Sequence, residues 1–142
     1  MYDKLSYFAA CYVLCASANP TVIGYYTLSA TSVEITSLPP ALAKRSGRYQ
    51  TVPAALLGRL AVDSRFAGQK LGTDLMLNAM RRTLRTGIGI KAIVVDALDQ
   101  RATAFYEQFG FARVEDNPLR LCLSLSAIRE VFAGEQDEPS SE

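Results

Sequence analysis

The chain has 142 residues and a mass of 15.5 kDa, the size of one domain, with 49% hydrophobic and 20% charged residues, as in folded proteins. The absence of histidine excludes Ser-His-Asp and Cys-His catalysis and His-ligated metal sites. The net charge of +1, taken alone, argues against a nucleic-acid partner. We expect a single domain over residues 1–132 and a disordered acidic tail over 133–142.

The cysteines give information about the cellular compartment. Cys11 and Cys15 are four residues apart and would share one face of a helix, either as a redox pair or half a zinc site, or as two small core residues. The odd count of three, without a signal peptide, predicts a protein of the reducing cytoplasm. No run of 18 apolar residues is present, so we expect no contact with a membrane.

The first elements are expected in the amino-terminal third. Residues 4–15 predict the end of a helix that runs into a strand. Two strands are expected next, over 22–30 and 32–37, because these stretches are rich in aromatic and β-branched residues. Pro39 and Pro40 end the second of them.

The central part of the chain carries the clearest periodicity. The apolar run 53–62 predicts a strand buried on both faces. An amphipathic helix follows, with an apolar side formed by Leu71, Leu75, Leu77, Met80 and Leu84. The remaining elements, in chain order, are a strand over 92–97, a helix over 101–109 ended by Gly110, strands over 111–114 and 119–125, and a helix over 127–132. This order predicts a mixed α/β domain.

A glycine-bearing loop connects the predicted strand 53–62 to the amphipathic helix. The start of a helix presents unpaired main-chain N–H groups and the positive end of the helix dipole, which together bind anions. Gly68 and Gly72 would let the backbone approach a phosphate closely. The loop is neither a Walker loop nor a GxGxxG motif, and a plain tight turn is the alternative interpretation.

A second motif, about thirty residues further on, supports a functional interpretation of this loop. It reads Ala104-Phe105-Tyr106-Glu107-Gln108-Phe109-Gly110-Phe111. The two segments at this spacing resemble the GNAT superfamily of acetyl-CoA-dependent N-acetyltransferases. The resemblance implies the GNAT fold, with a mixed, mostly antiparallel central sheet flanked by helices. It also implies acetyl-CoA as co-substrate and no metal.

Four stretches look like one class within this superfamily, the TacT/AtaT-type toxins of bacterial toxin–antitoxin modules: Ile23–Ser29, Val52-Pro53, Leu57–Asp63 and Ala97–Asp99. The resemblance implies that the chain acetylates the α-amino group of aminoacyl-tRNA and thereby blocks translation. It further implies a ribbon–helix–helix antitoxin as partner, and a homodimer.

The resemblance assigns roles to the residues that match the motifs. Tyr106 would protonate the departing CoA thiolate, which a phenol within reach can do; the alternative is a core tyrosine. Main-chain groups of Leu60, Ala61 and Val62 would bind the pantetheine arm and polarise the thioester. The phosphates of acetyl-CoA would be bound by the loop residues Ala67, Gly68, Gln69, Lys70, Leu71, Gly72 and Thr73.

No motif identifies a general base. Glu34 and Asp96 lie on predicted strands and are the candidates. A base is not essential, because a free α-amino group has a pKa of roughly 7.7–8.0 and esterification of the carboxyl group lowers it further. Water can then accept the proton after attack.

The chain departs from the family pattern in two places. The superfamily loop reads Q/R-x-x-G-x-G/A, whereas this loop has Ala67 and Lys70 at the first and fourth positions. The amino-terminal helix of the class is expected to be shortened here. Two other functions therefore stay open: acetylation of a small amine or protein amino group, and a degenerate, non-catalytic GNAT fold that serves as a binding module.

The distribution of charge reverses the first impression given by the net value. Residues 41–102 contain eleven basic and four acidic residues, a net +7, whereas residues 103–142 contain three basic and eight acidic residues, a net −5. The basic central segment is sufficient to attract an RNA electrostatically. The residues expected to contact tRNA are Lys44, Arg45, Arg48, Arg81, Arg82 and Arg85.

Overall fold

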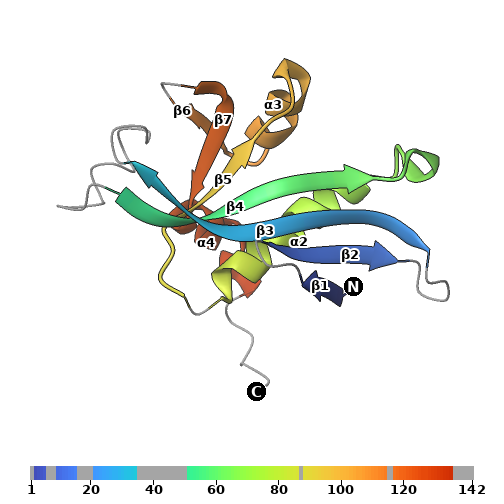
Figure 1. Ribbon diagram of the computed structural model, residues 1–142, viewed down its shortest axis with the longest axis horizontal. Helices are drawn as coiled ribbons and strands as arrows, with labels where there is room; N and C mark the ends of the chain where they lie inside the picture. The colour runs from blue at the N-terminus through green and yellow to red at the C-terminus, as the bar shows by residue number, and fades with distance from the viewer. Residues whose placement is uncertain are drawn as a thin grey trace.

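The computed structural model describes residues 2–5, 9–15, 21–34, 51–86, 88–114 and 117–135, with residues 2–5 as backbone only. Its centre is a seven-stranded sheet in the order β1-β2-β3-β4-β5-β7-β6 (Figure 1). Neighbouring strands are antiparallel except β4 and β5, which are parallel. The strands are β1 Tyr2–Leu5, β2 Ala10–Cys15, β3 Val22–Glu34, β4 Thr51–Val62, β5 Ala92–Asp96, β6 Ala112–Val114 and β7 Asn117–Ser124. The predicted mixed, mostly antiparallel sheet is confirmed.

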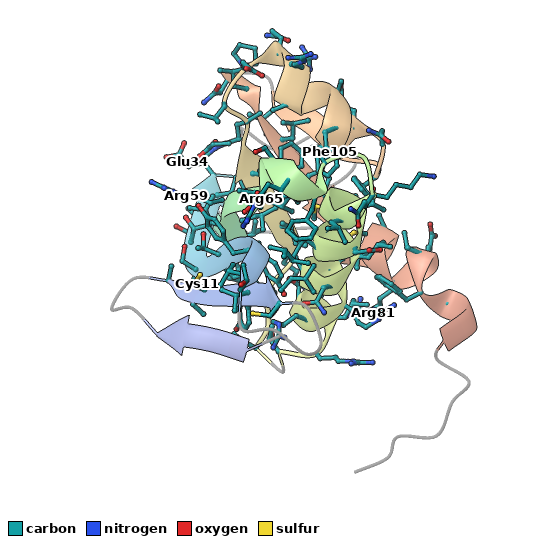
Figure 2. All side chains as sticks on the ribbon, turned by 90° about the vertical axis from the view of Figure 1, so that its right-hand side faces the viewer. Cys11, Glu34, Arg59, Arg65, Arg81 and Phe105 are labelled. Atoms are coloured by element: carbon teal, nitrogen blue, oxygen red, sulfur yellow. The ribbon has the colours of Figure 1, made fainter. Side chains whose placement is uncertain are left out.

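The helices of the described chain build a core against this sheet. They are α2 Leu71–Leu84, α3 Gln100–Glu107 and α4 Leu125–Val131, with short 3-10 turns η2 Ser64–Phe66 and η3 Ala133–Glu135. Figure 2 shows α2 and α4 on the same side of strands β3 and β4. Side chains of β5 alternate between two cores: Ile93 and Val95 join the larger one with the helices, and Ala92 and Val94 join a smaller one. No described helix is long and apolar enough to cross a membrane.

Strands β4 and β5 separate after a short parallel contact. They pair only over residues 54–57 of β4 and 92–95 of β5. A β-bulge follows, because Thr27 of β3 faces both Gly58 and Arg59 of β4. A Cβ atom at Gly58 would lie 2.6 Å from Thr27 Oγ1, so only glycine fits here. Beyond the bulge, β4 follows β3 alone and diverges from β5, as Figure 1 shows.

This divergence corrects the prediction that strand 53–62 is buried on both faces. Ala54, Ala55 and Leu57 are buried, but Gly58, Arg59 and Ala61 are exposed. A strand is covered on both sides only where it has neighbours on both sides. Residues 58–62 have a strand partner on one side alone in the described chain.

Helix α2 packs very closely on the strands because of Gly24 in β3. A Cβ atom at this position would lie 2.9 Å from Leu75 Cδ1 and 3.1 Å from the main-chain oxygen of Ala61. Both distances are shorter than ordinary contacts, so a larger residue fits only if the Leu75 side chain, the helix or β4 moves. Gly24 therefore sets the distance between α2 and the sheet.

Three further predictions were wrong in detail. Residues 10–15 form β2, which pairs with β1 over 2–5, so no helix end lies in this part and Cys11 and Cys15 lie on a strand. A single strand, β3, replaces the predicted strand 22–30 and the described part, 32–34, of the predicted strand 32–37, since no turn residue separates them. Residues 35–37 and the Pro39-Pro40 break lie outside the described residues.

The predicted helices and the C-terminal strands are confirmed, with boundaries shifted by one to two residues. The buried face of α2 is rotated from the predicted one, because Met76, Ala79 and Thr83 are buried while Leu77 is only partly so. Thr83 is buried without penalty, since its hydroxyl donates to the Ala79 carbonyl at 2.8 Å. Of the tail predicted over 133–142, residues 133–135 form the 3-10 turn η3. Residues 136–142 lie outside the described chain, so a disordered tail stays a prediction for them.

Candidate functional site

The turn after β4 is fixed at its start by Asp63. The Asp63 N–H donates to the Ile23 carbonyl at 2.8 Å, which holds the turn to β3. The Asp63 carboxylate accepts from the Arg65 N–H at 2.9 Å and forms an ion pair with the Arg65 guanidinium at 2.8 Å. These hydrogen bonds from Arg65 lower the pKa of Asp63, which stays ionised. The chain therefore leaves the sheet in a defined direction and returns to it at α2.

The segment that follows exposes the start of α2. Gly68 has φ of +84°, and Lys70 adopts the left-handed conformation, with φ of 60° and ψ of 26°. Lys70 occupies the N-cap position and gives no side-chain cap. The first N–H groups of α2 therefore have no side-chain acceptor from the cap residue, and they coincide with the positive end of the helix dipole. This arrangement suits the phosphates of acetyl-CoA.

Lys70 shows how the departure from the family loop is accommodated. A non-glycine residue in the left-handed region costs about 1–2 kcal/mol, and Lys70 is the one such residue in the described chain. The backbone thus keeps the conformation that glycine favours, while the side chain adds a positive charge. The strain lies at the point where an anion is expected, as is common for functional loops.

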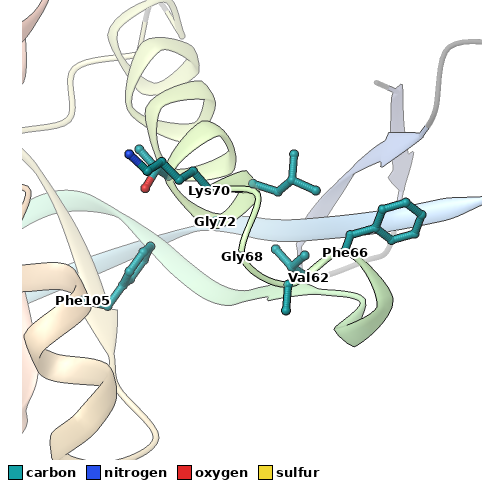
Figure 3. Close-up of a pocket in the computed structure, with 9 residues that line it drawn as sticks. Val62, Phe66, Gly68, Lys70, Gly72 and Phe105 are labelled. Carbon is teal, nitrogen blue, oxygen red and sulfur yellow. The ribbon is translucent and has the colours of Figure 1, made fainter.

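A pocket of about 320 Å³ opens in front of this helix start. Figure 3 shows it between the loop, the first turn of α2 and the Phe105 ring of α3. Two aromatic walls, Phe66 and Phe105, were not predicted as site residues. The complete lining consists of Val62, Phe66, Ala67, Gly68, Lys70, Leu71, Gly72, Thr73 and Phe105.

The other predicted cofactor residues lie beside the pocket. Leu60 and Ala61 pair with Tyr26 and Tyr25 of β3, and neither lines the pocket. They stand where β4 has left β5, so their main-chain groups on that side have no strand partner within the described residues. Gln69 is exposed and does not line the pocket. The roles of these residues stay predictions.

Tyr106 lies on α3 between aromatic neighbours. Its ring packs edge-on against Phe105 at 5.2 Å and Phe111 at 5.8 Å between centroids, and 8% of the residue is exposed. Burial raises the pKa of Tyr106 above its ordinary value of 10.0. Within the described chain no recorded group accepts a hydrogen bond from its hydroxyl. A buried, protonated phenol with an uncommitted proton is suited to act as a general acid.

Neither predicted general base has a suitable position. Glu34 pairs with Thr51, at the opposite end of β3 from Gly24 and Val62. Ten residues of strand place it roughly 30 Å from the cofactor pocket. Asp96 ends β5, where Arg120 binds its carboxylate through two hydrogen bonds of 2.7 and 2.8 Å. Those bonds lower the pKa of Asp96, so it is a poor proton acceptor at neutral pH.

The predicted tRNA residues fall into two groups. Lys44, Arg45 and Arg48 lie outside the described residues. Arg81 and Arg82 lie in the last turn of α2 and Arg85 is its C-cap, away from the cofactor pocket; Figure 2 labels Arg81 on this helix. They line a second pocket together with residues of β2 and α2.

The cysteines and carboxylates form no metal site in the described part of the chain. No group of three or more potential ligands comes together there. No disulfide bond joins any of the three cysteines, all of which lie among the described residues. Cys122 is buried, and this burial raises the pKa of its thiol to about 11, so it stays protonated and unreactive at neutral pH.

The fold and the pocket define a class of protein. A model of the acetyltransferase (GNAT) family matches residues 1–111, and the chain belongs to this family. Its reaction is therefore acetyl transfer from acetyl-CoA, and the predicted fold class, enzyme class and co-substrate are confirmed.

Relatives place the chain more closely, among the toxins that it was predicted to resemble. It is 36% identical over 124 residues to the tRNA-acetylating toxin of Mycobacterium tuberculosis, covering 86% of this chain and 72% of that protein. The structure of AtaT complexed with acetyl-methionyl-tRNAfMet superposes with a TM-score of 0.81 at 31% identity, covering 88% of this chain and 76% of that one. A mutant of AtaT bound to the C-terminus of the antitoxin AtaR and to acetyl-CoA gives a TM-score of 0.72 at 30% identity, covering 88% and 72%.

Proposed function

We propose that the chain is a toxin that transfers the acetyl group of acetyl-CoA to the α-amino group of an aminoacyl-tRNA. The observation that carries this proposal is the open start of α2, at the point where β4 and β5 separate. Tyr106 does not line this pocket, but its ring packs against that of Phe105, which does. Its substrate is inferred from the relatives, one of which is a tRNA-acetylating toxin at 36% identity. An acetylated α-amino group cannot form the next peptide bond, so translation stops.

The chemistry assigned to this chain needs few side chains. The neutral amine attacks the thioester carbonyl, and a C–N bond forms. As the intermediate collapses, the C–S bond breaks and Tyr106 gives its proton to the departing CoA sulfur. The amine proton leaves to water, and the tyrosinate regains a proton from solvent. General acid catalysis of this kind contributes on the order of 10²–10⁴-fold.

The absence of a placed base fits this sequence of steps. An aminoacyl α-amino group has a pKa below the roughly 7.7–8.0 of a free one, so a useful fraction is neutral at pH 7. The ion pair between Asp96 and Arg120 and the remote position of Glu34 leave no carboxylate of the predicted pair to assist. Water is the acceptor that the proposal uses.

The proposal extends to location and partners. Charged tRNA is found in the cytoplasm, so the chain acts there. By analogy with AtaT, whose mutant binds the C-terminus of AtaR, we place this chain under the control of an antitoxin of the ribbon–helix–helix type. A homodimer is the expected active form. Size-exclusion chromatography with light scattering tests the dimer, and a small ribbon–helix–helix protein encoded in the neighbouring gene would support the antitoxin.

The decisive test follows the acetyl group. The chain is incubated with radiolabelled acetyl-CoA and total aminoacylated tRNA, and the label is expected in the tRNA fraction. It should be released by mild alkali, which cleaves the aminoacyl ester. Label found only on protein or on small amines would reject the proposal in favour of another acetyltransferase, and no acetyl-CoA binding by calorimetry would favour a non-catalytic fold.

The variant Tyr106→Phe tests the assignment of the acid. We expect turnover to fall by about 10²-fold or more, with acetyl-CoA affinity nearly unchanged, because the ring contacts with Phe105 and Phe111 remain. Equal losses in turnover and in affinity would instead make Tyr106 a structural residue. Turnover is measured with charged tRNA, and affinity by calorimetry.

A further inference from the structure

A second pocket lies at the C-terminal half of α2. Its volume is about 390 Å³, and its lining consists of Tyr12, Asn78, Arg81, Arg82, Arg85 and Thr86. The helix rises roughly 20 Å between Gly72 and Arg85. The two pockets share no residue, so this one is separate from the pocket that suits acetyl-CoA.

The position of Arg82 is fixed by neutral partners. Its guanidinium lies 3.9 Å from the centroid of the Tyr12 ring, and its Nε donates to the Tyr26 hydroxyl at 3.1 Å. Tyr26 in turn donates to Asn78 Oδ1, and its ring stacks on that of Tyr12 at 5.2 Å. These contacts hold the arginine in one orientation without neutralising its charge.

Two arginines of this pocket, Arg82 and Arg85, form no ion pair with the carboxylates of the described residues. The ion pairs recorded in the described chain join Arg65 to Asp63, Arg113 to Glu107 and Arg120 to Asp96. None of them involves Arg82 or Arg85, although the two lie one turn apart on the same helix. Basic residues at the end of a helix are favoured by the negative end of its dipole, so α2 tolerates this charge. A guanidinium that neutral partners hold in one orientation, and that has no ion-pair partner among the described residues, points to an anionic ligand.

The donors in the pocket suit a phosphate group. Arginine presents a planar set of N–H donors that matches phosphate oxygens. Because Asn78 Oδ1 accepts from Tyr26, its amide N–H donors are directed away from that bond, and Thr86 adds a hydroxyl. An acidic peptide fits less well, since peptide sites also bury apolar anchors. The exposed large hydrophobic residues of the described chain, Val22, Ile88, Leu98 and Val131, do not line the pocket.

We propose that this pocket, formed by Tyr12, Asn78, Arg82, Arg85 and Thr86, binds a backbone phosphate of the RNA substrate. The inference rests on the proposed function, because it takes the acceptor to be an RNA. The site positions the nucleic acid and plays no part in acetyl transfer itself. It makes α2 a helix with one anion site at each end, the first formed by main-chain N–H groups and the second by side chains.

The test compares two exposed arginines of equal charge. Arg85→Gln removes a pocket residue that packs against no core, and Arg129→Gln removes an exposed arginine of α4 that does not line the pocket. Binding of total deacylated tRNA is measured by filter retention between 50 and 200 mM salt. We expect Arg85→Gln to weaken binding about tenfold and to lower the salt slope by about one. Arg129→Gln should stay within about twofold of the unmodified chain.

Each other outcome has a defined meaning. Equal weakening in both variants would overturn the proposal, because it would show general attraction to a basic surface. Unchanged tRNA affinity in Arg85→Gln, with loss of binding to a polyglutamate peptide, would also overturn it and assign the pocket to a protein partner. Acetyl transfer to charged tRNA by the unmodified chain is measured in parallel. Its absence rejects the proposed acceptor, whereas a selective loss of tRNA binding in Arg85→Gln still supports the phosphate site.

Discussion

The two ends of α2 handle negative charge in different ways. At the first turn, Gly68 and the left-handed Lys70 leave main-chain N–H groups open, and the cost is backbone strain. At the last turn, Arg82 is held by Tyr12 and Tyr26, and it forms no ion pair with the carboxylates of the described residues. A main-chain site depends on conformation and on the absence of side chains. A side-chain site depends on packing and hydrogen bonds, so substitutions should affect the two ends separately.

The largest effect is expected from filling the main-chain site. In Gly72→Leu, the side chain enters the pocket beside the Phe105 ring, and acetyl-CoA affinity should fall roughly hundredfold. The matched control is Gly72→Ala, because its Cβ would lie 3.6 Å from Phe105, an ordinary contact. Calorimetry measures the cofactor, and filter binding should show unchanged tRNA affinity. A parallel loss of tRNA binding in Gly72→Leu would show that the two ends are not independent.

The pH dependence should also separate the two ends. Below the pKa of the substrate amine, the rate of acetyl transfer should rise about tenfold per pH unit and then level off. Burial raises the pKa of Tyr106, so its phenol keeps its proton to higher pH. We therefore expect no decrease in rate at pH values up to about 10. Binding of tRNA should stay constant between pH 6 and 9, because arginine remains charged. A fall in rate between pH 8 and 9.5 would show that another group is the acid.

The hydrogen-bond network of the side-chain site predicts a smaller effect. Tyr26→Phe removes the hydroxyl that accepts from Arg82 and donates to Asn78. We expect the free energy of unfolding, measured in urea, to fall by about 1–2 kcal/mol. Affinity for tRNA should fall several-fold because Arg82 loses its orientation, while acetyl-CoA affinity stays the same. Unchanged tRNA binding would show that Arg82 does not need this support.

The smallest effect concerns the strained residue of the loop. Lys70→Gly removes the left-handed strain and should stabilise the chain by roughly 1 kcal/mol, which raises Tm by about 3 °C. It also removes a positive charge from the pocket, so acetyl-CoA affinity should fall several-fold. The opposite change, Gly68→Ala, introduces strain at φ of +84° and should lower Tm by a similar amount. No gain in stability for Lys70→Gly would contradict the strain at this position.

Much of the fold was predictable because local patterns determine it. The apolar period of α2 and the buried run of β5 each identify an element without knowledge of its neighbours. The short apolar stretch that became β2 did not, since a run of this length fits a helix or a strand equally well. The bulge at Gly58 and Arg59 depends on the partner strand β3, and the exposed second half of β4 follows from it.

The candidate site also has one part that local sequence patterns predict and another part that depends on the folded chain. The loop from Ala67 to Thr73 is continuous in sequence and was found from its motif. Phe105 reaches the pocket from α3, and only the folded chain brings it to Gly72. The network of Tyr12, Tyr26 and Asn78 joins three elements that no local pattern connects. The basic character of α2 is visible in the sequence and identified its arginines as candidates. It did not identify the tyrosine and asparagine side chains that hold Arg82 in place.

The close contact at Gly24 lies where α2, the helix that carries both proposed anion sites, packs on the sheet. Because this residue has no side chain, Leu75, near the start of α2, packs closely on β3 at this point. The contact therefore lies nearer to the proposed acetyl-CoA site at the first turn of α2 than to the proposed phosphate site at its last turn. A methyl group added at Gly24 would force the Leu75 side chain, α2 or β4 to shift. The missing side chain at this position thus helps to set where α2 lies on the sheet, and with it the positions of both proposed sites.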